Sequence, residues 1–143
     1  MILVTGSEAS GKKTYVKSLG FTDEEMSYDP YSDAPVILNV ERAVFLALMK
    51  EEEAACADAK ALKDSADEKV ERTEKAKINE AALLFGQLKN KKVVTINEVG
   101  SGVIPAERAE RLGREATGRL SVLLAKEAEQ VVRMVCGIPV VLK

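Results

Sequence analysis

The sequence predicts an α/β fold with a mostly parallel sheet, because short apolar runs alternate with segments of helical periodicity. The first apolar run ends in a glycine-rich loop, and a helix pattern follows it directly. The last two apolar runs lie on either side of Gly137 and predict a C-terminal strand pair. The chain has 143 residues and shows no internal repeat or separate domain, so we expect a single domain over 1–143.

A buried strand and a short helix begin the chain. Met1–Thr5 is a continuous apolar run, which suits a buried parallel strand. Lys12–Leu19 has helical periodicity and stops at Gly20. One face of this helix carries its apolar side chains, namely Tyr15, Val16 and Leu19. Phe21–Pro35 is polar and turn-rich, and Val36–Leu38 is a second buried strand.

Residues 41–90 predict a helical hairpin. Its first helix begins at Glu41 and repeats apolar residues at helical spacing: Val44, Phe45, Leu48, Met49, Ala55 and Ala59. A capping box at Ser65–Glu68 predicts the start of the second helix, with the turn near Lys63–Ser65. The second helix places these residues inward: Val70, Ile78, Ala81, Ala82, Phe85 and Leu88. We interpret the dense charge of the hairpin as a solvated face rather than a binding tract.

The C-terminal part predicts a strand, a helix and two further strands. Val93–Ile96 is the third buried strand, and Pro105 suits the first turn of the helix after it. That helix buries Leu112, Ala116, Leu120 and Leu124. Val131–Val135 and Ile138–Leu142 form the closing strand pair, in which Pro139 indicates an edge position.

Composition argues against several classes of function. The net charge of −2 and the 4% aromatic content do not favour nucleic-acid binding. No apolar run approaches the roughly 20 residues of a membrane span, and no signal peptide is visible, so we expect a cytoplasmic protein. Histidine is absent, which removes the commonest general base and zinc ligand. Cys56 and Cys136 lie in unlike contexts and read as reduced thiols, and no metal ligands are identified.

A glycine-rich loop with a terminal lysine follows the first strand and predicts a phosphate-binding site. The motif is Gly, four residues, Gly, Lys and then Ser or Thr, placed between a strand and a helix. Backbone N–H groups of such a loop and the positive helix end bind phosphates, and Lys12 would reach the terminal phosphates of ATP or GTP. The residues expected to bind nucleotide are Gly6, Ser7, Glu8, Ala9, Ser10, Gly11, Lys12, Lys13 and Thr14.

The last position of the loop departs from the motif. Lys13 stands where a Ser or Thr hydroxyl normally ligates Mg²⁺, and an ammonium group can only donate. Thr14 comes one residue later, which rotates a helical side chain by about 100°. Glu8 would repel phosphate unless its side chain points outward. Nucleotide binding is therefore expected, whereas a role for Mg²⁺ and turnover stay open. The alternative is a tight strand-to-helix turn that binds nothing.

A long ordered signature occupies the C-terminal half. Its residues are Asn97-Glu98-Val99-Gly100, Gly102, Ile104-Pro105, Arg108, Arg111, Arg114, Gly118-Arg119, Ala125, Ala128, Val131 and Gly137-Ile138. With the first strand and loop, this pattern resembles the adenosylcobinamide kinase/adenosylcobinamide-phosphate guanylyltransferase family. The resemblance implies a three-layer P-loop NTPase fold of the RecA-like type, homo-oligomers, and action late in cobalamin assembly. Family members phosphorylate adenosylcobinamide and then transfer GMP to that phosphate through a histidine.

Several departures from the family bear on activity. The segment Gly20–Pro35 is too short to hold the strand and helix that carry the family's histidine, and the sequence has no histidine. The guanylyltransferase step is therefore not expected. Asn39 stands where the family usually has an acidic residue, and Ser121-Val122 replaces its Asn-Gln pair.

Two carboxylates and the loop lysine are candidates for chemistry. Lys12 and Glu98 are the expected catalytic residues, because Glu98 ends a strand at the usual ligand crevice of an α/β sheet. Glu98 could hold Mg²⁺ through water or orient a hydroxyl, or it could simply cap a loop. Glu41 could stand in for the missing acid, or it could be an ordinary carboxylate in the first turn of a helix.

Four arginines of the signature have two interpretations. Arg108, Arg111, Arg114 and Arg119 could contact an anionic ligand or a neighbouring subunit. Their i,i+4 spacing from glutamates favours an exposed face whose charges are paired: Glu107–Arg111, Glu110–Arg114 and Glu115–Arg119.

Two functions follow from these patterns. One is a cobinamide kinase-like enzyme that uses ATP or GTP. The other is a non-catalytic nucleotide-binding or regulatory relative. A helical-hairpin interaction protein without nucleotide remains a third reading.

Overall fold

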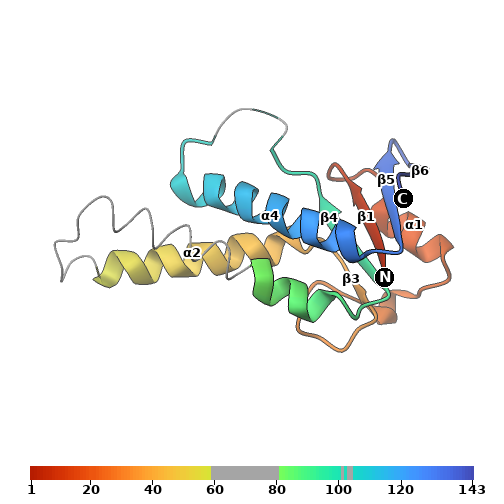
Figure 1. Ribbon diagram of the computed structural model, residues 1–143, viewed down its shortest axis with the longest axis horizontal. Helices are drawn as coiled ribbons and strands as arrows, with labels where there is room; N and C mark the ends of the chain where they lie inside the picture. The colour runs from red at the N-terminus through yellow and green to blue at the C-terminus, as the bar shows by residue number, and fades with distance from the viewer. Residues whose placement is uncertain (59–80, 101, 103–104) are drawn as a thin grey trace.

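The computed structural model describes the chain except for residues 59–80, 101 and 103–104 (Figure 1). The strands are β1 (Ile2–Gly6), β2 (Met26–Ser27), β3 (Val36–Ile37), β4 (Val93–Asn97), β5 (Gln130–Val135) and β6 (Ile138–Val141). The helices are α1 (Lys12–Ser18), α2 (Glu41–Asp58) and α4 (Arg108–Glu127), with a 3-10 turn η1 (Asp23–Glu25) and a helical segment over 81–88. The predicted α/β class is confirmed.

The described strands form a six-stranded sheet in the order β2-β3-β4-β1-β5-β6. Neighbouring strands are parallel except β5 and β6, which form an antiparallel hairpin. In the central strand, Gly6 lies opposite Asn97 on one side and Met134 on the other. The loops that follow β1, β3 and β4 therefore gather at the carboxyl ends of these parallel strands, where α/β proteins bind ligands. The predicted edge position of Pro139 is confirmed, because β6 ends the sheet.

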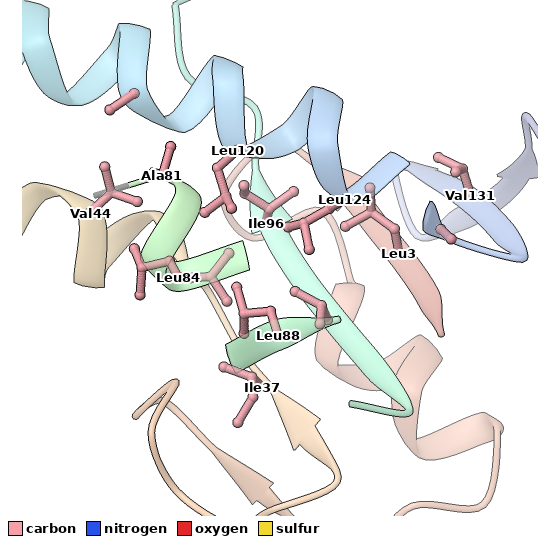
Figure 2. Close-up of a cluster of buried hydrophobic side chains, with 14 of the residues drawn as sticks. Leu3, Ile37, Val44, Ala81, Leu84, Leu88, Ile96, Leu120, Leu124 and Val131 are labelled. Atoms are coloured by element: carbon pink, nitrogen blue, oxygen red, sulfur yellow. The ribbon is translucent and has the colours of Figure 1, made fainter. Parts of the chain in front are cut away.

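Apolar side chains on the two faces of the sheet form two clusters, so the fold has the predicted three layers. Along β1, Leu3 belongs to one cluster and Val4 to the other, because side chains alternate along a strand. The larger cluster packs the sheet against α2, α4 and segment 81–88 (Figure 2), with Leu3, Ile37, Val44, Leu84, Leu88, Ile96, Leu120 and Leu124. The smaller cluster lies on the α1 side and contains Val4, Val16, Val36, Leu38, Val93, Val132 and Met134.

Helix α4 buries the face that the sequence predicts and lies along α2 (Figure 1). All its predicted inward residues are buried: Leu112, Ala116, Leu120 and Leu124. A Cβ at Gly113 would lie only 2.4 Å from Cε1 of Phe45 on α2. The lack of a side chain at Gly113 therefore allows the two helices to approach closely. No helix in the described part of the chain is both long and apolar enough to cross a membrane.

The hairpin prediction over 41–90 is confirmed only at its described ends. Of the apolar residues that repeat along α2, Val44 and Leu48 are buried, whereas Met49 is 50% exposed. In segment 81–88 the buried face is Ala81, Leu84 and Leu88, whereas the predicted Ala82 is exposed. The spacing of three and four residues selects this face and leaves residue 82 outside it. The other predicted features lie outside the described residues: the Lys63–Ser65 turn, the Ser65–Glu68 capping box, Ala59, Val70 and Ile78, and the side chain of Ala55.

The segment between α1 and β3 differs from its prediction. It contains a strand of two residues, β2, which pairs with β3 in parallel, although the sequence predicts only turns there. A capping box between Thr22 and Glu25 closes the 3-10 turn before this strand. Leu19, predicted to lie on the apolar face of the first helix, is the C-cap of α1 and is 38% exposed. The positive φ of Gly20, +97°, turns the chain away immediately after it.

The sequence predicts Pro105 in the first turn of α4, but in the structure Pro105 precedes the helix. The helix begins at Arg108, and its N-cap Glu107 still has extended backbone angles. The guanidinium of Arg111 donates to the carbonyls of Pro105 and Ala106, at 2.9 and 2.7 Å. These contacts hold the preceding chain in front of the helix instead of within it.

Candidate functional site

The loop between β1 and α1 requires glycine at both ends. A Cβ at Gly6, where φ is +146°, would lie 2.7 Å from the carbonyl oxygen of Met134 and from Oγ of Ser10. At Gly11, where φ is +94°, it would lie 3.2 Å from Cα of Gly137. The two glycines of the motif are therefore fixed by close approach and by backbone conformation together.

The turn between β5 and β6 packs against this loop. The backbone N–H of Gly137 donates to the carbonyl oxygen of Ser10 at 3.0 Å. Ser10 is itself buried, and its N–H bonds weakly to the carbonyl of Ser7 at 3.3 Å. Ala9, between them, has a φ of +57°, a conformation that a non-glycine residue adopts only at some cost. The C-terminal hairpin therefore supports the loop conformation.

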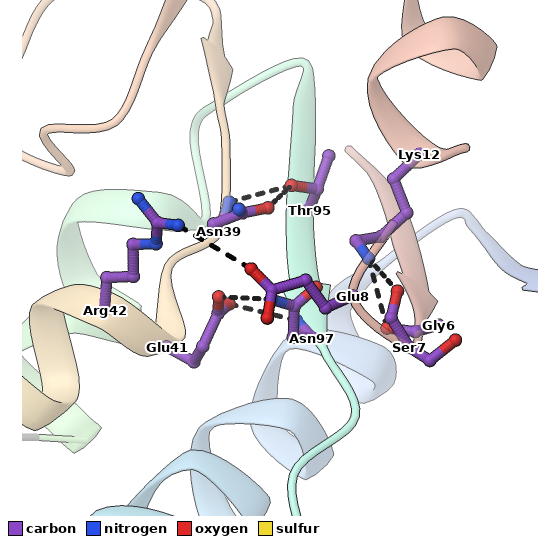
Figure 3. A network of polar contacts seen from close by, with 9 residues as sticks. All are labelled: Gly6, Ser7, Glu8, Lys12, Asn39, Glu41, Arg42, Thr95 and Asn97. Atoms are coloured by element: carbon purple, nitrogen blue, oxygen red, sulfur yellow. Dashed lines mark hydrogen bonds and ion pairs between the residues drawn. The ribbon is translucent and has the colours of Figure 1, made fainter. Parts of the chain in front are cut away.

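Lys12 is buried within the loop and is 6% exposed. Its Nζ donates to the carbonyls of Gly6 and Ser7, at 3.1 and 2.6 Å (Figure 3). It also approaches Oγ of Ser10 at 3.4 Å. These acceptors are neutral oxygens of the loop itself. An anion in front of the loop would offer the ammonium group stronger, charge-assisted hydrogen bonds.

Acidic side chains surround the Lys12 ammonium. Burial lowers the pKa of Lys12 below its ordinary value, and the negative charges of Glu41, Glu8 and Glu98 oppose that shift. Both candidate carboxylates of the sequence, Glu41 and Glu98, are therefore close enough to act on Lys12, together with Glu8 of the loop. Their negative charges favour the protonated, charged form of the buried Lys12 side chain.

A cavity of about 290 Å³ opens beside the loop. The expected loop residues from Glu8 to Thr14 all line it, whereas Gly6 and Ser7 contact Lys12 through their carbonyls. The rest of its wall comes from three places: the segment after α1, the segment after β3, and β4 itself. These residues are Tyr28, Leu38, Asn39, Thr95 and Asn97. Tyr28 and Thr95 belong to no motif that marks them as site residues. Their signals in the sequence are an aromatic residue in a polar segment and a hydroxyl in a buried strand.

Asn39 and Thr95 form one polar part of the cavity wall. The backbone N–H of Asn39 donates to Oγ1 of Thr95 at 2.8 Å, and the Thr95 hydroxyl lies 3.4 Å from Oδ1 of Asn39. Asn39 has a φ of +52°, which asparagine tolerates because its short polar side chain bonds locally. The position therefore carries an amide where an acidic residue was expected.

Glu41 and Asn97 form the adjoining part (Figure 3). Glu41 lies in the first turn of α2, as predicted, but it is also buried and bonded to β4. Its Oε2 accepts the backbone N–H of Asn97 at 2.9 Å, and its Oε1 accepts the side-chain amide Nδ2–H at 2.8 Å. Because a carboxylate only accepts, the amide of Asn97 is fixed in one orientation. Among the described residues, its buried Oδ1 has no hydrogen-bond partner.

Glu98 lies next to the loop but is paired. Its backbone N–H donates to the carbonyl of Gly6 at 3.0 Å, which ties it to the loop. Both its carboxylate oxygens accept from Arg133 on β5, at 2.7 and 2.8 Å, and this pairing raises the pKa of Arg133. The sequence did not predict this fork-like pair. A catalytic role of Glu98 stays a prediction.

Lys13, at the position of the motif's hydroxyl, forms an ion pair outside the phosphate loop. Its Nζ lies 2.8 Å from Oδ1 of Asp23, whose Oδ2 lies 2.6 Å from Nζ of Lys17. The hydrogen bond to Asp23 raises the pKa of Lys13. The two lysines lower the pKa of Asp23 to about 2. The described residues contain no group of three or more His, Cys, Asp or Glu side chains that could hold a metal.

Glu8 reaches from the loop towards α2 but still lines the cavity, so the outward orientation that would avoid repulsion of phosphate is only partly met. Its side chain is 77% exposed and lies 3.8 Å from the guanidinium of Arg42 on α2 (Figure 3). Arg42 in turn lies 5.9 Å from the ring centre of Tyr28. Arg42 therefore lies close to two residues of the cavity lining, Glu8 and Tyr28.

The arginines of α4 are engaged on the helix surface. Arg119 pairs with Glu115 at 2.8 Å, as the i,i+4 spacing predicts. Arg111 donates to the carbonyls that precede the helix, and Arg108 and Arg114 also have interaction partners. The interpretation as a paired, exposed face is confirmed for Arg119. Cys136, in the β5–β6 turn, is a free, exposed thiol.

Comparison with known proteins identifies one family. The family model described as cobinamide kinase / cobinamide phosphate guanyltransferase matches residues 37–142, more than half of the chain. The match begins after the phosphate loop and includes the cavity wall from Leu38 to Asn97 and the pair Glu98–Arg133. A search of the curated proteins finds no match.

Proposed function

Because this chain belongs to the cobinamide kinase / cobinamide phosphate guanyltransferase family, we propose that it binds ATP or GTP and phosphorylates adenosylcobinamide. The observation that carries the proposal is the buried ammonium of Lys12 beside the cavity. It lies in a strand–loop–helix segment with the glycines that a phosphate loop needs. This activity would place the protein in cobalamin synthesis or salvage.

Nucleotide binding would use the backbone N–H groups of the loop and the ammonium group of Lys12. The triphosphate would lie in the cavity lined by Glu8 to Thr14 and would accept hydrogen bonds from backbone N–H groups of the loop. Lys12 would exchange the carbonyls of Gly6 and Ser7 for phosphate oxygens, a stronger interaction because both partners are charged. The pairing of Glu8 with Arg42 would offset part of the repulsion between its carboxylate and the phosphates.

Phosphoryl transfer requires an aligned alcohol and neutralised charge. The acceptor hydroxyl oxygen would form a bond to the γ-phosphorus while the bond to the leaving β-phosphate oxygen breaks. Lys12 would stabilise the charge on the transferred group. Glu98 would take the hydroxyl proton, and Arg133 would hold its carboxylate in place through the two hydrogen bonds. Guanylyl transfer through a histidine is not part of the proposal, because the sequence contains no histidine.

A non-catalytic relative is the second candidate. It is favoured by Lys13, which offers no metal-binding oxygen, and by Asn39 in place of an acidic residue. Such a protein would bind nucleotide in the same cavity and regulate cobinamide use without transferring phosphate. Association into a homo-oligomer, as the family resemblance implies, is compatible with either function.

Transfer of radiolabelled γ-phosphate from ATP or GTP to adenosylcobinamide tests the proposal. We expect labelled adenosylcobinamide phosphate with the wild type and a loss of at least about a hundredfold in rate with Glu98→Gln. The matched control is Glu115→Gln, which also breaks a glutamate–arginine pair but lies on the exposed face of α4. Nucleotide binding without any transfer at high protein concentration would overturn the kinase function and leave the regulatory one.

A further inference from the structure

The residues around the cavity do not fit the magnesium ion that usually accompanies a nucleoside triphosphate. In the loop motif a Ser or Thr hydroxyl holds that ion, and an acidic residue from a neighbouring strand supports it. Here the two positions are Lys13 and Asn39. An ammonium group cannot ligate a cation, and the Asn39 amide already lies against Thr95.

The nearby carboxylates are already engaged. Both oxygens of Glu41 accept hydrogen bonds from Asn97, and both oxygens of Glu98 accept from Arg133. Glu8 is directed towards Arg42, away from the loop. No described cluster of acidic, histidine or cysteine side chains offers a metal site in their place.

Lys13 is positioned to supply positive charge instead. It lines the cavity, its side chain is 49% exposed, and its Nζ lies 2.8 Å from Asp23. Asp23 also pairs with Lys17 at 2.6 Å. If Lys13 moves to another anion, Asp23 keeps a cationic partner and no charge is left buried and unpaired.

We propose that the ammonium group of Lys13 replaces the metal ion. On nucleotide binding it leaves Asp23 and donates to oxygens of the terminal phosphates, so that the triphosphate binds without a divalent cation. Lys12 and Lys13 are adjacent on α1, about 100° apart around the helix, and would approach the phosphates from different directions. Each brings a compact charge with three donors, which can join two phosphate oxygens as a bridging metal does. This inference rests on the proposed nucleotide binding.

Calorimetric titration of ATP and GTP, in excess EDTA and in excess Mg²⁺ at equal ionic strength, tests it. For the wild type we expect affinities in the two conditions that differ by less than about threefold. Lys13→Ser restores the hydroxyl of the motif, so it should lose at least about tenfold in EDTA and recover much of this loss with Mg²⁺. Lys13 is half exposed, so both proteins should fold, which circular dichroism would verify.

Two further variants separate the possible causes. Lys126→Ser removes the same amount of charge from an exposed position in the last turn of α4, and we expect its affinity in EDTA to stay within about twofold of the wild type. Thr14→Ala removes the loop hydroxyl that follows Lys13 and lines the cavity, and its affinity should not depend on Mg²⁺ more than that of the wild type.

Three results would overturn the inference. These are wild-type binding that Mg²⁺ strengthens tenfold or more, an unchanged affinity of Lys13→Ser in EDTA, or an Mg²⁺ effect that disappears in Thr14→Ala. Each would leave nucleotide binding itself intact. A wild type that binds neither nucleotide in either condition would instead refute the proposed function, and this inference with it.

Discussion

Glu41, at the start of α2, accepts hydrogen bonds from the backbone N–H and from the side-chain amide of Asn97, at the end of β4, at 2.9 and 2.8 Å. The two residues are 56 positions apart in the sequence, and the pair joins the helix layer to the sheet beside the phosphate loop. Because Glu41 is buried, its hydrogen bonds are shielded from water. The pair therefore fixes one wall of the cavity.

Loss of this carboxylate should destabilise the fold. Glu41→Ala leaves the backbone N–H and the side-chain amide of Asn97 without this acceptor, and we expect the free energy of unfolding to fall by about 2–4 kcal/mol. Glu41→Gln keeps one acceptor oxygen and should lose about half as much. Urea denaturation measures both, with Glu115→Ala as the control for an exposed, paired glutamate. A loss in Glu41→Ala no larger than in Glu115→Ala would contradict the assigned role.

Two glycines of α4 should respond to alanine in opposite directions. At Gly113 a Cβ would lie 2.4 Å from the Phe45 ring, so we expect Gly113→Ala to destabilise by about 1–3 kcal/mol as α2 and α4 move apart. At Gly118 a Cβ would meet nothing within 4 Å, so Gly118→Ala should stabilise by about 0.5–1 kcal/mol through helix propensity. Thermal unfolding of the two variants side by side checks the packing, and equal shifts of the same sign would refute it.

The ion pairs of Asp23 should lower the midpoint of its titration. Lys13 and Lys17 lower the pKa of Asp23 from its ordinary value of 3.8 to about 2. Because the pKa is lowered in the folded state, these pairs stabilise the fold above pH 4 and lose that effect as the pH falls through about 2. Carboxyl-carbon NMR should give a midpoint near 2, and Asp23→Asn should remove this part of the acid sensitivity. A midpoint at the ordinary value would show that the pairs do not form in solution.

The parts of this fold that could be predicted are those encoded locally. The apolar runs, the loop glycines and the buried face of α4 each depend on residues within one or two turns of each other. The strand–loop–helix segment and the C-terminal strand pair were therefore predictable. The two-residue β2 was not, because its backbone pairs with β3 without an apolar run to mark it. The start of α4 was predicted too early from Pro105. Arg111 donates to the carbonyls of Pro105 and Ala106 and holds this segment ahead of the helix, a contact that no local pattern reveals.

The sequence indicated the strand–loop–helix segment of the candidate site but not its long-range contacts. Glu98 and Arg133 are 35 residues apart and meet because β5 lies next to β1 in the sheet, an order that no local pattern reveals. The same holds for Gly137, which supports Ser10. The sequence could therefore nominate Glu98 for chemistry but not show that it is paired.

Nucleotide binding through Lys12 is the central claim, and a calorimetric titration of ATP tests it most directly. The comparison is between the wild type, Lys12→Met, and Lys126→Met, which removes an exposed lysine from the last turn of α4. We predict saturable binding by the wild type and by Lys126→Met, and an affinity at least about tenfold lower for Lys12→Met, because the buried ammonium is lost. Identical titration curves for the wild type and Lys12→Met, with both proteins folded, would contradict it.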